Sequence, residues 1–162
     1  MSQEIQKVAV IGAGVMGAGI AAQIANTGID VVLLDIVPKD AKDRNIVAKT
    51  AVEKLKKTNP APLMHKRNAK RIQVGNVEDD LKLLKECDWI IEAVIERLDI
   101  KRDLYKKVSK HRKKDAIISS NTSTLPLGVL IEGLPKSFGE HFMITHFFNP
   151  PRYLRLLEIV TG

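Results

Sequence analysis

The sequence has a single cysteine, no long apolar run and no targeting segment. One cysteine, Cys87, cannot form an internal disulfide, which is typical of a reducing compartment and predicts a cytoplasmic protein. No segment approaches the roughly 18 consecutive apolar residues of a membrane-spanning helix. The polar N-terminus lacks the apolar core of a signal peptide and the Arg-rich pattern of a transit peptide. We therefore expect no membrane span.

Aromatic residues are also scarce, at 4% of the chain, although the net charge is +7. No RNA- or DNA-binding motif accompanies this charge, so nucleic acid is not an expected partner. The positive charge is concentrated between Lys39 and Arg71, where acids are few. A solvated helical face explains this segment, and an anion site for a phosphorylated partner is the alternative. No His or Cys residues have metal-ligand spacing, and we expect no metal.

The chain has 162 residues, of which 44% are hydrophobic, and this is enough for one packed domain. Apolar runs predict strands over 8–11, 31–34, 72–74, 87–94, 116–120, 142–146 and 154–160, with a turn at 75–76. Periodicity predicts helices over 18–27, 41–58, 63–70, 77–84, 100–111 and 126–132. Strands alternating with helices indicate an α/β fold with a doubly wound, mostly parallel sheet, whose ligands bind beyond the carboxyl ends of the strands.

A glycine-rich turn follows the first predicted strand. Gly12 would permit the tight turn, Gly14 would let the backbone approach a pyrophosphate, and Gly17 would let the next helix pack closely. Met16 lies in the same turn, where the helix N-terminus favours an anion. Asp35 ends the second strand, where its carboxylate can accept hydrogen bonds from ribose hydroxyls. This arrangement predicts a Rossmann-type dinucleotide site; a glycine turn without a ligand is the alternative.

The acid also bears on which dinucleotide is bound. A 2′-phosphate would meet Asp35 as one negative charge against another, and the next residue is Ile36 rather than an arginine. Both features favour NAD over NADP. NADP is the alternative, because Lys39 and Arg44 are close enough in sequence to pair with its 2′-phosphate.

Candidate catalytic residues lie at or near the ends of the later strands. His146 closes an apolar strand, and Glu158 lies twelve residues later inside another. If the two strands are neighbours, the carboxylate can hold one imidazole nitrogen while the other acts as a general base. Glu92 and Glu96 could simply cap a strand end. The polar segment 119–123 could form a turn, and it lacks the pattern of a serine hydrolase.

Four segments together resemble the NAD-binding domain of the 3-hydroxyacyl-CoA dehydrogenase family of fatty-acid β-oxidation. They are GAGVMGAGI at 12–20, IEAVIE at 91–96, SNTS at 120–123 and HFFNP at 146–150. The resemblance spans nearly the whole chain, and the last two segments are more specific than the glycine turn. It implies oxidation of L-3-hydroxyacyl-CoA to 3-ketoacyl-CoA with transfer of hydride to NAD.

The resemblance also implies roles for individual residues. His146 matches the catalytic base, Glu158 the acid that orients it, and Ser123 a serine that contacts substrate and cofactor. The implied cofactor-binding positions are Gly12, Gly14, Met16, Gly17, Asp35, Glu96, Lys101, Ser123 and Asn149. The basic segment corresponds to a region that holds coenzyme A, for which Lys54 and Lys57 are the candidates.

The family adds a helical C-terminal domain that closes over the substrate, and residues 1–162 correspond to the NAD-binding domain alone. We therefore expect a separate domain or a part of a longer protein, weakly active until that helical domain or a second subunit supplies the rest of the site. A non-catalytic NAD-binding module and a dehydrogenase of small β-hydroxy acids are the alternatives. Chain-length preference and oligomeric state are not predicted.

Overall fold

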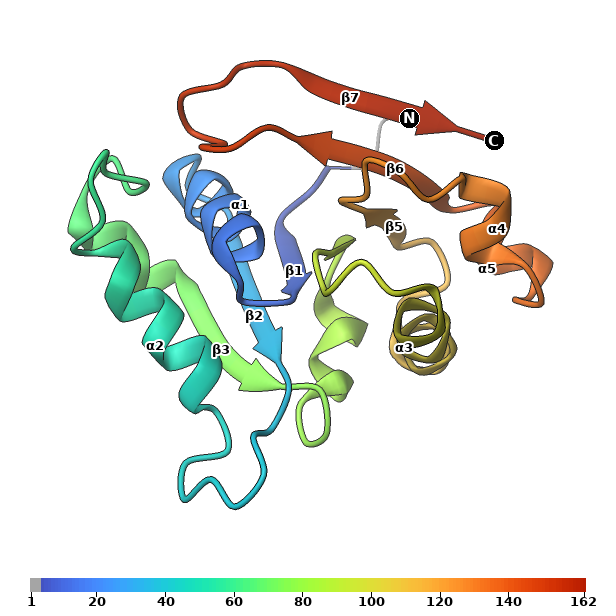
Figure 1. Ribbon diagram of the computed structural model, residues 1–162, viewed down its shortest axis with the longest axis horizontal. Helices are drawn as coiled ribbons and strands as arrows, with labels where there is room; N and C mark the ends of the chain where they lie inside the picture. Colours follow the sequence, from blue (N-terminus) through green and yellow to red (C-terminus); the bar gives the residue numbers. More distant parts are fainter. Residues whose placement is uncertain (1–3) are drawn as a thin grey trace.

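The computed structural model describes residues 4–162, which form one seven-stranded sheet with helices on both faces (Figure 1). In chain order the elements are β1 (Lys7–Ile11), α1 (Val15–Asn26), β2 (Asp30–Asp35), α2 (Ile46–Leu55), η1 (Lys66–Arg71), β3 (Ile72–Asn76), η2 (Leu81–Glu86), β4 (Trp89–Glu92), α3 (Leu98–His111), β5 (Ile117–Ser120), α4 (Leu127–Ile131), α5 (Lys136–Gly139), β6 (Phe142–Phe147) and β7 (Leu157–Thr161). The two η elements are 3₁₀ helices. The predicted α/β, doubly wound sheet is confirmed.

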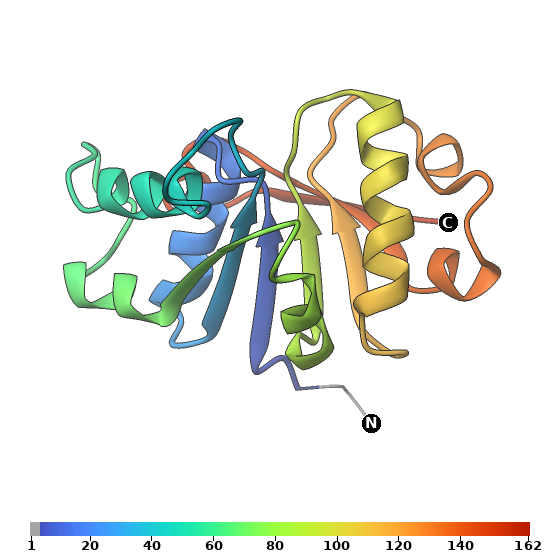
Figure 2. The same ribbon diagram turned by 90° about the horizontal axis from the view of Figure 1, so that it is seen from below.

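The sheet order is β3-β2-β1-β4-β5-β6-β7, with β1 to β6 parallel and β7 antiparallel to β6. The chain first winds outward from β1 to β3, then crosses to β4 and winds the other way. The connections that follow β1 and β4 therefore run in opposite directions along the sheet. The place between these two strands is the topological switch point, where such folds bind ligands. Figure 2 shows the parallel strands with their arrowheads toward one edge of the sheet.

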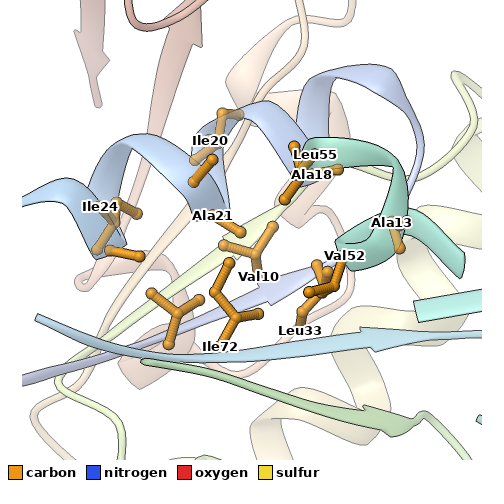
Figure 3. Close-up of a cluster of buried hydrophobic side chains, with 14 of the residues drawn as sticks. Val10, Ala13, Ala18, Ile20, Ala21, Ile24, Leu33, Val52, Leu55 and Ile72 are labelled. Carbon is orange, nitrogen blue, oxygen red and sulfur yellow. The ribbon is translucent and has the colours of Figure 1, made fainter. Parts of the chain in front are cut away.

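Two apolar layers cover the sheet because alternate strand residues point to opposite faces. Val10 and Leu33 contact the layer formed with α1 and α2, shown in Figure 3, whereas Ala9 and Val32 contact the layer formed with η2 and α3. All four are fully buried. Burying a valine or leucine side chain contributes about 1.5–3 kcal/mol, so these layers hold the strand ends in place.

Several predicted elements differ in extent. The helix expected over 41–58 begins only at Ile46, because Asp43 Oδ1 accepts a hydrogen bond from the Asn45 N–H (3.0 Å) and forms a turn. The helix expected over 63–70 is the shorter η1. The helix expected over 77–84 is a turn followed by η2, because Asn76 Oδ1 accepts from the N–H groups of Glu78 and Asp79. Local side-chain hydrogen bonds replaced helical ones before α2 and before η2.

The strand predictions are confirmed in number, with shifts at their ends. β3 continues through the expected turn at 75–76, and the last strand begins at Leu157 rather than residue 154. The four-residue helix α5 was not predicted, since it is too short to show a periodic pattern. No helix among residues 4–162 is long and apolar enough to cross a membrane.

At the opposite edge of the sheet from the strand carboxyl ends, Asp88 ties the start of β1 to β4. Its carboxylate accepts hydrogen bonds from the N–H groups of Gln6 (2.9 Å) and Lys7 (3.0 Å) and from Lys113 Nζ. Burial opposes ionisation, but the Lys113 ammonium and the two N–H donors hold the pKa of Asp88 below its usual value. This carboxylate is therefore a structural group, remote from the candidate site.

We expect Asp88→Asn to lower the free energy of unfolding at pH 7 by about 1–3 kcal/mol, because it weakens a charge-assisted network. Since the folded pKa of Asp88 is depressed, its stabilisation is present above the unfolded value of about 4 and is lost as pH falls through the folded pKa. Denaturant unfolding at pH 7 and pH 3 measures both effects. Asp115→Asn, at an exposed acid near Lys113, is the control; an equal loss at both pH values in Asp88→Asn would contradict the account.

Candidate active site

The glycine turn between β1 and α1 is forced by close backbone contacts. Gly12 has φ +107°, and a Cβ there would lie 2.3 Å from the carbonyl oxygen of Ala93. A Cβ on Gly17 would lie 1.7 Å from the Gly12 carbonyl oxygen and 3.4 Å from Ala93 Cβ. Gly17 therefore allows close packing against the turn itself, a more specific role than the helix–sheet contact predicted for it. Ala93 follows β4, so the turn lies at the switch point of the sheet.

Gly14 faces open space at the start of α1. No other part of the protein lies within 4 Å of the Cβ position on Gly14, and no side chain caps the helix. The first helical hydrogen bond runs from Ala18 N–H to the Gly14 oxygen (2.9 Å), so the N–H groups before Ala18 lack a partner in the helix. Met16 is half-buried in this first turn. Free donors beside an open glycine fit the pyrophosphate of a dinucleotide.

Asp35 lies at the carboxyl end of β2, beside this turn. Its carboxylate accepts hydrogen bonds from the N–H of Ala13 and from that of Ile36 (2.6 Å), so it also fixes the turn. Ile36 and Ile95, which follow the two strands flanking β1, are 63% and 62% exposed. Exposed aliphatic side chains at this edge suit the flat faces of an adenine ring. Neither was predicted from the sequence, although Ile36 directly follows β2 and Ile95 lies three residues after the end of β4.

A second acid, Glu96, holds the loop that follows β5. Thr122 Oγ1 and Thr124 Oγ1 donate to Glu96 Oε1, the latter at 3.1 Å, and these threonines flank Ser123. Ser123 is exposed at this position. Burial opposes ionisation, but the Thr122 hydroxyl and the Lys101 ammonium hold the pKa of Glu96 below its usual value. The ionised Glu96 carboxylate therefore fixes the loop that carries Ser123.

Lys101, expected to contact the cofactor, is fully buried beneath this acid. Its ammonium lies 2.6 Å from Glu92 Oε1 and 3.2 Å from Glu96 Oε2. In this structure the Lys101 ammonium is paired with the two carboxylates and is not exposed at the surface of the site. Glu92 is buried as well, so its role is more than the capping of a strand end.

His146 and Glu158 are direct cross-strand partners in the pairing of β6 with β7. His146 Nδ1 lies 2.8 Å from Glu158 Oε2, and the ring packs against Phe148 with centroids 4.6 Å apart. The expected contact between histidine and acid is confirmed. With Nδ1 donating to the carboxylate, Nε2 is the nitrogen left to accept a proton.

Asn149 lines a groove of about 700 Å³ that begins at the glycine turn. The groove runs between α1 and α2 and is bounded by the proline-rich segments 58–62 and 149–152. Lys54 lies on its wall, and Lys57 lines a shallower hollow beside it. Arg152 Nη1 donates to the carbonyl oxygens of Ala61 (2.6 Å) and Leu63 (3.2 Å), which joins the two proline-rich segments. No sequence pattern predicted this link.

The structure thus places the predicted residues at one edge of the sheet, with Lys54 and Lys57 beyond the glycine turn on α2 and its C-terminal end. Residues 4–162 include no group of three His, Cys, Asp or Glu side chains that could hold a metal ion. A doubly wound sheet, a glycine turn with free donors and a histidine–carboxylate pair are typical of the dinucleotide-binding domains of nicotinamide-dependent oxidoreductases.

The chain belongs to the NAD-binding domain family of the 3-hydroxyacyl-CoA dehydrogenases, whose family model matches residues 7–162. It is 58% identical over 157 residues to a probable 3-hydroxyacyl-CoA dehydrogenase of Deinococcus radiodurans, covering 97% of this chain and 45% of that protein. A putative fatty acid oxidation complex trifunctional enzyme of Rickettsia felis is 54% identical, over 99% of this chain and 22% of its own length. The chain therefore spans less than half of each of these relatives.

Among solved structures, 3-hydroxybutyryl-CoA dehydrogenase from Escherichia coli superposes with a TM-score of 0.79 at 27% identity, covering 97% of this chain and 32% of that one. The resemblance noted in the sequence, the Rossmann-type fold and NAD as the family's cofactor are confirmed. The role of each site residue stays a prediction.

We expect Gly14→Ala to weaken NAD binding at least about tenfold, because the added methyl group enters space that the pyrophosphate needs. The melting temperature should change by no more than about 2 °C, since the new Cβ meets no protein atom and the φ of −69° suits alanine. Calorimetric titration and thermal unfolding measure the two effects.

Gly128→Ala is the matched control, because its Cβ also meets nothing within 4 Å and it lies in α4, outside the candidate site. It should leave NAD affinity unchanged. Wild-type affinity in Gly14→Ala would show that the pyrophosphate does not lie against this turn.

Proposed function

We propose that this domain binds NAD and carries the catalytic base for oxidation of L-3-hydroxyacyl-CoA to 3-ketoacyl-CoA in fatty-acid β-oxidation. The observation that carries the proposal is the His146–Glu158 pair, which lies at the same sheet edge as the glycine turn. The relatives in the comparisons support it, since their names describe 3-hydroxyacyl-CoA dehydrogenases and fatty acid oxidation enzymes.

In this mechanism His146 Nε2 takes the proton of the C3 hydroxyl, and Glu158 stabilises the imidazolium that forms. The glycine turn and Asp35 would hold NAD, which would supply the hydride acceptor for the C3 hydrogen, so that the carbon is oxidised to a ketone. Ser123 and Asn149 orient the reacting groups, and Phe148 keeps water from one face of the imidazole. A positioned base of this kind contributes about 10²–10⁴-fold to the rate.

The groove supports coenzyme A as the carrier of the substrate. Its walls are mainly apolar, as the pantetheine arm requires, and Lys54 and Lys57 provide positive charge for phosphates near its α2 side. We assign these two lysines to substrate binding. This reading also gives the basic segment around α2 a function beyond solvation.

The remaining part of the active site would come from a helical domain, either later in a longer chain or on a second subunit. The groove is open, and the exposed Ser123 has no protein covering it among residues 4–162. A covering domain would exclude water and fix the substrate. We propose a cytoplasmic location for the assembled enzyme.

Two other functions would use the same fold. A non-catalytic NAD-binding module would need no aligned His146–Glu158 pair. A dehydrogenase of small β-hydroxy acids would not need the apolar groove or its lysines. The geometry therefore favours the acyl-CoA enzyme over both.

The test is acetoacetyl-CoA reduction by NADH in a chimera, with this domain replacing its counterpart in the Deinococcus relative. His146→Ala should lower kcat about 100-fold or more through loss of the base, and Glu158→Gln should lower it less because the imidazole loses its orienting carboxylate. Glu140→Gln, remote from the site, should have no effect. An inactive but NAD-binding chimera would contradict the enzyme proposal; full activity in His146→Ala would contradict the assigned base.

We also expect NAD to bind at least about tenfold more tightly than NADP. Asp35 opposes a 2′-phosphate, and Arg44 is paired with Asp79 (2.7 Å) and Glu78 (2.8 Å), so its guanidinium is already neutralised. Asp35→Ser should narrow the difference between NAD and NADP affinity, because it weakens NAD binding and removes the repulsion of the 2′-phosphate. Calorimetry with both dinucleotides measures this, and equal wild-type affinities would refute the assigned preference.

A further inference from the structure

A buried carboxylate lies at the end of β4, behind the candidate site. Glu92 is 1% exposed, yet its oxygens accept hydrogen bonds from four donors. The donors are Lys101 Nζ (2.6 Å), Tyr105 OH (2.6 Å), Ser120 Oγ (2.5 Å) and the Val94 N–H (2.8 Å). Burial and the adjacent Glu92 raise the pKa of Tyr105 above its usual range, so the phenol stays a donor. The network joins α3, β4 and β5 at their site-facing ends.

Lys101 connects the buried Glu92 carboxylate to the loop that carries Ser123. Its ammonium bridges Glu92 and the partly exposed Glu96, whose Oε1 accepts from the hydroxyls of Thr122 and Thr124. Glu96 therefore holds the residue on each side of Ser123. A continuous series of charge-assisted contacts connects the sheet interior to the loop.

The same loop is tied to the strand that carries the histidine. Asn121 Oδ1 accepts a hydrogen bond from the N–H of Phe147 (2.9 Å), the residue after His146. Thr122 Oγ1, held by Glu96, accepts from the Leu125 N–H (3.1 Å). The backbone around Ser123 is thus fixed on one side by Glu96 and on the other by β6.

We propose that Glu92 and Lys101 are positioning residues, which fix Glu96 so that it clamps Thr122 and Thr124 and presents Ser123 to the cofactor and substrate. This inference rests on the proposed function, which places Ser123 in the active site. It assigns Lys101 an indirect action through Glu96, in place of the direct cofactor contact implied by the family resemblance.

Stability alone is a poor explanation of this pair. Removing an ammonium and a carboxylate from water costs several kcal/mol per ion, and well-packed apolar residues often replace buried ion pairs without loss. A pair at a site-facing strand end, with the lysine shared by a partly exposed acid, instead gives a defined geometry to that acid. The Asp88–Lys113 pair at the other end of β4 reaches no site residue and provides a comparison.

The test is hydrogen exchange at the Leu125 amide of this domain, read by NMR in Lys101→Met and Glu96→Gln. Both variants weaken the clamp on Thr122 because each removes a charge from it, so exchange should be about tenfold faster than in the wild type, the size expected for weakening a hydrogen bond to a charged group. Asp88→Asn, compared under conditions that match its overall stability to that of Lys101→Met, should leave this amide unchanged. Glu96 is 42% exposed, so Glu96→Gln folds even if the buried variant does not.

The functional readout is kcat of the chimera at saturating NADH. Lys101→Met should lower kcat about tenfold, whereas Asp88→Asn should not change it. Unchanged Leu125 exchange in both clamp variants, or equal acceleration in Asp88→Asn, would overturn this inference alone. Failure of the wild-type domain to bind NAD would instead overturn the proposed function, so the two failures are distinguishable.

Discussion

The site depends on the parallel pairing of β1 with β2 on one side and β4 on the other. Because the three strands end at one edge, the backbone after β1 must turn directly against the backbone after β4. Gly12 and Gly17 are required there, since a Cβ on either would overlap a carbonyl oxygen. Asp35 then reaches the same turn from β2. One packing constraint thus creates both the open helix N-terminus and the position of the ribose-binding acid.

The histidine–carboxylate pair of the site depends on a different strand pairing. β7 is the one antiparallel strand of the sheet among residues 4–162, and its register with β6 sets Glu158 directly opposite His146. A shift of one residue would move the carboxylate to the other face of the sheet. Twelve residues of chain separation therefore become a 2.8 Å contact, and the imidazole tautomer follows from it. The prolines after β6 bound the groove whose opposite wall is α2, which carries Lys54.

Strong periodic patterns and short motifs carried the sequence-based predictions. The strands, the glycine turn, Asp35 and the His146–Glu158 contact were predicted because each depends on local pattern or on simple adjacency of strands. The late start of α2 and the turn before η2 were missed, since side-chain hydrogen bonds from Asp43 and Asn76 competed with the helix. Burial of Glu92 and Lys101 was also missed, because acids at a strand end and lysines on a helix are ordinarily exposed.

The proposed function requires hydride transfer between the nicotinamide bound by this domain and C3 of an acyl-CoA. The most direct measurement is isotope transfer: the chimera reduces acetoacetyl-CoA with NADH that carries deuterium at the transferable C4 position, and the product is analysed by mass spectrometry. We expect one deuterium on C3 of 3-hydroxybutyryl-CoA. A product without deuterium at C3, or NADH left unoxidised while bound, would contradict the proposed function.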